Sequence, residues 1–166
     1  MNIGELIKNK IDEKGGKQVC LANKMSCSKS KISRICKNEY INTKKLIPVC
    51  IHLNYNFFND YAEYVDKKIP KDNDLSFSYI YKFFMGEEMH IGQLIRKIKK
   101  ERGIKTSILA EKMNCSEKNM QSIYTRTNMY TDMLFNFCKT LNFNFFEIYA
   151  EYIAEQLDEK NNEKKG

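Results

Sequence analysis

Apolar residues recur along this chain with the period of an α-helix. Ile91, Leu94, Ile95 and Ile98 follow the spacing i, i+3, i+4, i+7, which places all four on one helix face. A similar series starts at Ile3. Neither region contains the strict alternation that is typical of a half-buried strand. The pattern therefore predicts an all-α protein.

The chain repeats itself after 88 residues. Residues 3–65 align with residues 91–153 without a gap, and 26 of the 63 positions are identical. The segments "LNYNFF" and "LNFNFF" and the segment "YAEY", present twice, belong to this match. We therefore predict two tandem copies of one unit. The predicted organisation is a first copy at 1–66, a connector at 67–89, a second copy at 90–153 and a tail at 154–166.

Each unit is expected to hold five short helices. Gly15 and Gly103 would end the first helix, because a residue after a helix end often needs positive φ. The second helix is expected at about 17–25 and 105–113. The predicted N-caps come in pairs: Ser28 and Ser116 for the third helix, Thr43 and Thr131 for the fourth, and Asn56 and Asn144 for the fifth.

Pro48 lies inside the predicted fourth helix of the first copy. Proline lacks the N–H that this helix needs, so the helix either starts late or bends. The connector combines a turn-rich stretch, "KKIPKDND", with an apolar stretch at 75–84 that is either a short strand or a short helix between the copies. The tail is expected to extend the last helix and then to fray.

Charge indicates the kind of partner. The net charge is +7, and each copy carries +4, while the connector is neutral and the tail is −1. A basic surplus in folded units favours a polyanionic partner, either nucleic acid or an anionic membrane surface. No apolar run approaches the ~20 residues of a membrane helix, and the start lacks the apolar region of a signal peptide. We expect a cytoplasmic, nucleoid-associated protein without a membrane partner.

The cysteines and histidines point away from catalysis and metal binding. None of the six cysteines forms a C-x-x-C pair, and only two histidines are present. Cys27 and Cys115 occupy equivalent positions, as do Cys50 and Cys138, which is typical of packing. The two histidines lack a nucleophile or carboxylate at a recognisable spacing. We predict no enzyme, no cofactor, no metal site and no small-molecule ligand.

The segment "QVCLANKMSCSKSKISRIC", residues 18–36, resembles the helix-turn-helix of lambda-repressor/Cro-type regulators, also called XRE-type. The second copy, "TSILAEKMNCSEKNMQSIY", keeps the apolar positions but starts with Thr106 in place of glutamine. Ser26 and Asn114 stand where that family usually has glycine. The residues that carry the resemblance in the first copy are Gln18, Leu21, Ala22, Met25, Ser28, Ile32 and Ile35.

The resemblance implies two tandem five-helix domains whose third helices contact bases or phosphates in the major groove. The apolar positions Ile32, Ile35, Met120 and Ile123 are expected to be core. The implied DNA-contacting residues of the first copy are Gln18, Lys29, Ser30, Lys31, Ser33, Arg34 and Lys37. Those of the second copy are Thr106, Lys118, Asn119, Gln121, Ser122 and Arg126, near the acidic Glu117.

The two third helices differ in their polar faces. The first is basic without an acidic residue and offers Arg34, which suits guanine. The second offers Asn119 and Gln121, which suit adenine. Because the two third helices offer different side chains to the bases, we predict that the double-stranded DNA site is asymmetric.

The function expected from this resemblance is a sequence-specific transcriptional regulator, most simply a repressor. Single-unit members commonly bind as dimers, so this chain either supplies both units itself or forms a homodimer. The alternative is a protein-interaction or dimerisation module, antitoxin-like or a phage-type scaffold, in which the second copy does not bind DNA. The aromatic residues of the second copy are consistent with such docking or with burial in its own core: Tyr124, Tyr130, Phe135 and Phe137.

Overall fold

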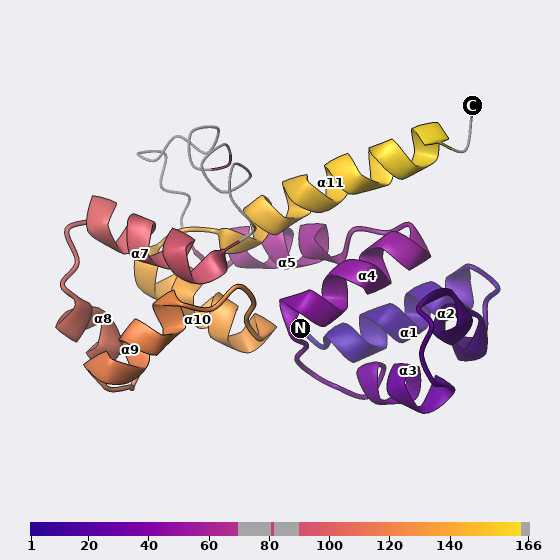
Figure 1. Ribbon diagram of the computed structural model, residues 1–166, viewed down its shortest axis with the longest axis horizontal. Helices are drawn as coiled ribbons and strands as arrows, with labels where there is room; N and C mark the ends of the chain where they lie inside the picture. The colour runs from indigo at the N-terminus through magenta and orange to yellow at the C-terminus, as the bar shows by residue number, and fades with distance from the viewer. Residues whose placement is uncertain (70–80, 82–89, 164–166) are drawn as a thin grey trace.

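The computed structural model describes residues 1–69, 81 and 90–163, and this part of the chain is all-helical (Figure 1). The predicted all-α fold is confirmed. The first helical segment consists of α1 (Ile3–Glu13), α2 (Gln18–Lys24), α3 (Lys29–Ile35), α4 (Thr43–Leu53) and α5 (Phe57–Asp66). The second helical segment consists of α7 (Ile91–Glu101), α8 (Thr106–Lys112), α9 (Glu117–Tyr124), α10 (Thr131–Leu141) and α11 (Phe145–Glu163).

Local capping chemistry explains several helix ends. The Ser28 hydroxyl accepts a hydrogen bond from the Lys31 N–H at 3.3 Å, and the Ser116 hydroxyl accepts one from the Asn119 N–H at 3.2 Å. Gly15 follows α1 with φ of 61°. These predicted caps are confirmed, because each one depends only on residues within a single turn.

The remaining predicted ends agree in the same way. Gly103 follows α7 with φ of 64°. Asn56 accepts from the Phe58 N–H and Asn144 from the Phe146 N–H, both at 3.2 Å. The caps predicted for the fifth helices are therefore confirmed.

The caps predicted for the fourth helices are wrong. Asn42 is the N-cap of α4, where its side-chain oxygen accepts from the Lys44 N–H at 2.9 Å, and Tyr130 is the N-cap of α10. Thr43 and Thr131 are instead the first helical residues, and their side chains are 1% and 0% exposed. Their hydroxyls bond to the opposite segment, as described below.

Pro48 does not delay the start of its helix. Helix α4 begins at Thr43, and α10 begins at the corresponding Thr131. The late-start alternative is therefore wrong, and α4 contains Pro48 as its sixth residue.

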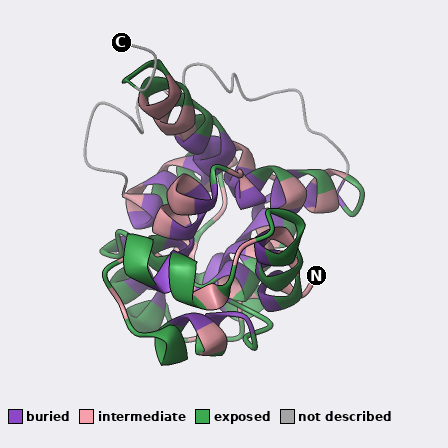
Figure 2. Ribbon diagram, turned by 90° about the vertical axis from the view of Figure 1, so that its right-hand side faces the viewer, coloured by how far each residue is buried: buried purple, intermediate pink, exposed green. Residues whose placement is uncertain are grey.

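Each segment packs its helices around apolar side chains (Figure 2). Ile32, Ile35, Met120 and Ile123 are buried as expected. Cys50 and Cys138 are fully buried, and burial raises the pKa of each thiol to about 12. The packing role predicted for these cysteines is confirmed.

The aromatic residues of the second segment do not share one environment. Tyr124 and Phe137 are buried, Phe135 is half-buried, and Tyr130 is 51% exposed. Burial in the core is thus confirmed for Tyr124 and Phe137 and is wrong for Tyr130.

The two segments meet through short backbone stretches that precede α4 and α10. The Thr43 N–H donates to the Met129 carbonyl at 2.8 Å, and the Thr131 N–H donates to the Ile41 carbonyl at 2.9 Å. The Thr43 hydroxyl accepts from the Met129 N–H, and the Thr131 hydroxyl accepts from the Ile41 N–H, both at 3.2 Å. Each of these four bonds thus has a counterpart in which both residues are shifted by 88 positions.

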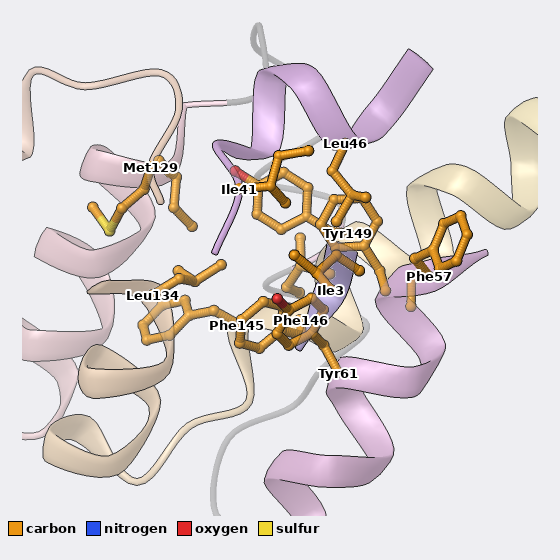
Figure 3. Packing of buried hydrophobic residues seen from close by; sticks show 14 of the residues in the cluster. Ile3, Ile41, Leu46, Phe57, Tyr61, Met129, Leu134, Phe145, Phe146 and Tyr149 are labelled. Carbon is orange, nitrogen blue, oxygen red and sulfur yellow. The ribbon is translucent and has the colours of Figure 1, made fainter. Parts of the chain in front are cut away.

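Helices α5 and α11 continue this reciprocal contact (Figure 3). Tyr61 stacks on Phe146 with ring centroids 4.6 Å apart, and Tyr149 stacks on Phe58 at 4.9 Å. The hydroxyls of Tyr61 and Tyr149 donate to the opposite threonines, at 2.9 Å to Thr131 and 3.3 Å to Thr43.

The capping asparagines of α5 and α11 also cross between the segments. The Asn56 amide donates to the Ala150 carbonyl at 2.7 Å, and the Asn144 amide donates to the Ala62 carbonyl at 3.0 Å. We call all of these contacts the reciprocal interface. It holds the two segments in one defined relation.

Two predictions concern the connector and the tail. The apolar stretch at 75–84 lies outside the described residues except for Tyr81, so its predicted strand or helix is not addressed. Helix α11 continues to Glu163, which confirms that the tail extends the last helix. Among the described residues, no helix is long and apolar enough to span a membrane.

Candidate nucleic-acid interface

Helices α2 and α3 form a helix-turn-helix in the first segment. Four residues separate them, and Ser26 takes a left-handed conformation with φ of 47°. Leu21 and Ala22 on α2 and Ile32 on α3 are buried. The apolar residues therefore fix how α3 lies against α2 and leave its other face to solvent.

Helices α8 and α9 form the same arrangement in the second segment. Asn114 takes the left-handed turn position with φ of 50°, and Leu109 and Ala110 are buried opposite Met120. The two positions where the resembled family usually has glycine thus both adopt positive φ, which asparagine tolerates better than most residues.

The exposed face of α3 is strongly basic. Ser33 and Gln18 are half-buried, with Gln18 at the start of α2. Figure 2 looks onto the end of the molecule that the first segment forms. The predicted contact residues of the first segment that are exposed are Lys29, Ser30, Lys31, Arg34 and Lys37.

The exposed face of α9 is nearly neutral, because Glu117 is exposed beside Lys118. Thr106 is half-buried, and its hydroxyl accepts a hydrogen bond from the Lys99 ammonium at 3.1 Å. Thr106 is therefore less accessible than the other predicted residues of this segment, and its hydroxyl already has a partner. The exposed ones are Lys118, Asn119, Gln121, Ser122 and Arg126.

Two glycines set the position of the third helices, and the sequence prediction did not assign them this role. The Gly4 N–H donates to the Asn38 carbonyl at 3.0 Å, just after α3, and the Gly92 N–H donates to the Arg126 carbonyl at 2.9 Å. A Cβ on Gly4 would lie 2.7 Å from the Asn38 oxygen, and one on Gly92 would lie 2.4 Å from the Ile123 oxygen. The "IG" pair that both repeats share is the sequence signal that could have revealed this role of Gly4 and Gly92.

His90 has a structural place at the start of α7. Its Nδ1 accepts a hydrogen bond from the Gln93 N–H at 3.2 Å, so the imidazole acts as the N-cap. Within the described residues, no group of three His, Cys, Asp or Glu side chains is arranged to hold a metal ion.

The reciprocal interface relates the two helix-turn-helix arrangements to each other. In Figure 1, α3 and α9 lie toward the same lower edge of the molecule, in opposite halves. The structure thus presents two exposed third helices with different side chains on one scaffold.

Comparison with known proteins addresses the second segment. No curated protein and no solved structure matches the chain. Residues 95–154, which run from within α7 to about the middle of α11, match the family model of the Cro/C1-type helix-turn-helix DNA-binding domain.

Proposed function

We propose that the protein is a sequence-specific double-stranded DNA-binding regulator that places α3 and α9 of one chain in the major groove. The observation that carries this proposal is the reciprocal interface, which fixes two third helices with solvent-exposed polar faces. The family match at residues 95–154 supports DNA binding by the second segment. Bound in this way, the protein represses transcription by occupying promoter DNA.

The exposed side chains of α3 and α9 would make different kinds of contact with DNA. Lys29, Lys31 and Lys37 neutralise phosphates around α3, while Arg34 donates to a guanine edge. On α9, Asn119 and Gln121 reach adenine edges. The two half-sites therefore differ in sequence, although the scaffold that holds the readers is nearly symmetric.

Binding-site selection from random duplexes with the full chain tests this assignment. Arg34→Ala is expected to relax preference at one half-site and Gln121→Ala at the other, each costing ~1–3 kcal/mol. Gln156→Ala, on α11, is the matched control and keeps the wild-type preference. If neither Arg34→Ala nor Gln121→Ala changes the selected sequence, these readers are wrong.

The stoichiometry and salt dependence separate this function from its alternative. One chain per duplex site is expected, with a ~10³–10⁵-fold loss of affinity between 50 and 200 mM salt if ~6–10 phosphates are neutralised. A protein-interaction module would show little salt response and no sequence preference. An effect of Arg34→Ala without any effect of Gln121→Ala would indicate that only the first segment reads DNA.

A further inference from the structure

A cavity of about 390 Å³ lies in the first segment between the end of α1, helix α2 and the end of α4. Ile11, Leu21 and Leu53 contribute apolar side chains to its lining and belong to the buried core. Its volume falls in the range of small-molecule sites, about 300–1,000 Å³. The cavity can therefore accept an apolar group of modest size.

Cations surround this cavity. Lys14, Lys17 and Lys24 line it from the first segment, and Lys160 lines it from α11. Among the described residues that line it, none carries a carboxylate side chain. Within the described part of the chain, Lys17 and Lys24 form no ion pair. Several ammonium groups around one hollow create a positive potential that an anion would relieve.

The last helix helps to build this site. Helix α11 extends beyond the other helices of the second segment and contacts α4 of the first (Figure 1). The Lys160 ammonium donates to the Ile51 carbonyl there, and the Lys14 ammonium donates to the Asn54 carbonyl at 3.5 Å. These bonds to α4 hold both cations at the edge of the cavity.

The His52 side chain lies among the same lysines. The imidazole lines the cavity, and burial lowers its pKa, with further lowering by the charges of Lys160 and Lys24. Burial first, and then the neighbouring ammonium groups, thus disfavour a positive charge on this imidazole.

The corresponding positions of the second segment carry different side chains. Ile104 replaces Gly16 and packs against the core, while Thr140 replaces His52. Arg102 replaces Lys14 and donates to the Asn142 carbonyl at 2.9 Å. The hollow in the first segment exists at a place where the repeated sequence has diverged.

We propose that this cavity binds a small organic anion, whose apolar body contacts Ile11, Leu21 and Leu53 and whose acidic group faces the surrounding lysines. This inference goes beyond DNA binding and does not depend on it. A backbone phosphate of DNA would satisfy the lysines, but it has no apolar body to fill the lining. The combination of apolar floor and cationic rim therefore favours a small ligand.

The aromatic sulfonate 8-anilinonaphthalene-1-sulfonate is a suitable probe for the full-length protein, because it combines both chemical features. Its fluorescence titration is expected to show a site that weakens at least tenfold in the double variant Lys24→Gln/Lys160→Gln. Lys112→Gln, the counterpart of Lys24 in the second segment, is the matched control and keeps the affinity. Thermal melts followed by circular dichroism check that each variant is folded.

Gly16→Ile tests the cavity without removing charge. A Cβ at Gly16 would meet its nearest atom, the Ile11 carbonyl oxygen, at an ordinary 3.4 Å, and the larger isoleucine side chain is expected to occupy the cavity. It is expected to abolish probe binding. Cys20 lines the cavity and is exposed, so the bound probe should slow its alkylation, which peptide mass spectrometry measures.

Four results would overturn the proposal. One is the absence of probe binding, and another is binding that survives both Lys24→Gln/Lys160→Gln and Gly16→Ile. The third is an unprotected Cys20. If the lysine double variant binds DNA more weakly while it binds the probe normally, these lysines serve DNA phosphates and the small-anion site is wrong.

Discussion

Two threonines contribute more to this protein than their position at a helix start suggests. The Thr43 hydroxyl accepts from the Met129 N–H and from the Tyr149 hydroxyl, and the Thr131 hydroxyl accepts from the Ile41 N–H and from the Tyr61 hydroxyl. Because each threonine is buried, water does not reach its partners to replace the hydrogen bonds that the hydroxyl accepts.

Replacing these hydroxyls with methyl groups should destabilise the protein. Thr43→Val and Thr131→Val keep the side-chain shape but remove the oxygen that accepts from a buried N–H and from a tyrosine hydroxyl. We expect each to lower the free energy of unfolding in urea by about 1–3 kcal/mol. Thr125→Val, at an exposed threonine, is the control and should stay within about 0.5 kcal/mol. Equal effects at all three sites would contradict the role of the interface.

The tyrosines that meet these threonines make the stability depend on alkaline pH. Burial raises the pKa of Tyr61 to about 12 and raises that of Tyr149 as well. Since an unfolded tyrosine titrates near pH 10, the folded state favours the neutral phenol. The stability is therefore complete below pH 10 and declines as the pH rises toward 12.

Urea unfolding between pH 9 and 12 measures this decline. Tyr61→Phe should remove on the order of 2 kcal/mol of the pH-dependent loss, because the titrating group is gone. Tyr130→Phe, at an exposed tyrosine, should retain the wild-type decline. If the Tyr61→Phe protein loses stability with pH as steeply as the wild type does, the pKa of the Tyr61 phenol is the same in the folded and unfolded states, which contradicts the prediction.

The residue scale also shows where sequence reasoning reaches its limit. Ser28 and Asn56 were predicted correctly as caps, because a cap bonds to an N–H two or three residues away. Thr43 was assigned wrongly, because its real partners lie 86 and 106 residues further along the chain. The composition of one turn holds no information about such a distant contact.

At the scale of elements, helix α1 sets the position of α3 through a contact without side chains. Gly4 lies so close to the backbone after α3 that no Cβ fits between them. The corresponding contact of Gly92 lies between α7 and the end of α9.

A methyl group at Gly4 should therefore separate α1 from α3. Gly4→Ala is expected to lower the free energy of unfolding by about 1–3 kcal/mol, as overpacking does. Gly16→Ala is the matched control, since its Cβ would meet the Ile11 oxygen at an ordinary 3.4 Å. Chemical denaturation of the two variants compares them, and a neutral Gly4→Ala would mean that the helices adjust freely.

Helical periodicity predicted the helices themselves well, but not which of them cover each other. The apolar residues of α5 were predicted to be helical, whereas their stacking on α11 was not foreseen. Identity between the repeats is dense from Leu53 to Tyr64, and this density was the available signal. Periodicity alone cannot separate packing inside one repeat from packing between two, because both need the same apolar face.

At the scale of the whole molecule, the surfaces that pair the two segments are buried within one chain. We therefore expect a monomer of 19.6 kDa in solution. Light scattering coupled to size-exclusion chromatography measures this mass directly. A stable dimer at micromolar concentration would contradict the expectation and would favour a homodimer with further contacts.

The exposed faces of the third helices, which are the candidate DNA-contacting surfaces, could be predicted from the sequence, whereas the cavity could not. Exposure of Lys29 and Arg34 followed from the helical spacing of Ile32 and Ile35, because residues between buried positions point outward. The cavity beside α2 was not foreseen, because Gly16 and His52 differ from their counterparts and a repeat comparison draws attention to what is shared.

The reciprocal interface has a genetic consequence. In a homodimer, one codon encodes the same residue in both subunits, so any substitution changes both sides of the interface. Here Asn56 and Asn144 are encoded separately, as are Arg34 and its counterpart Ser122. The exposed face of each half can thus diverge independently while the contacts between the halves stay matched.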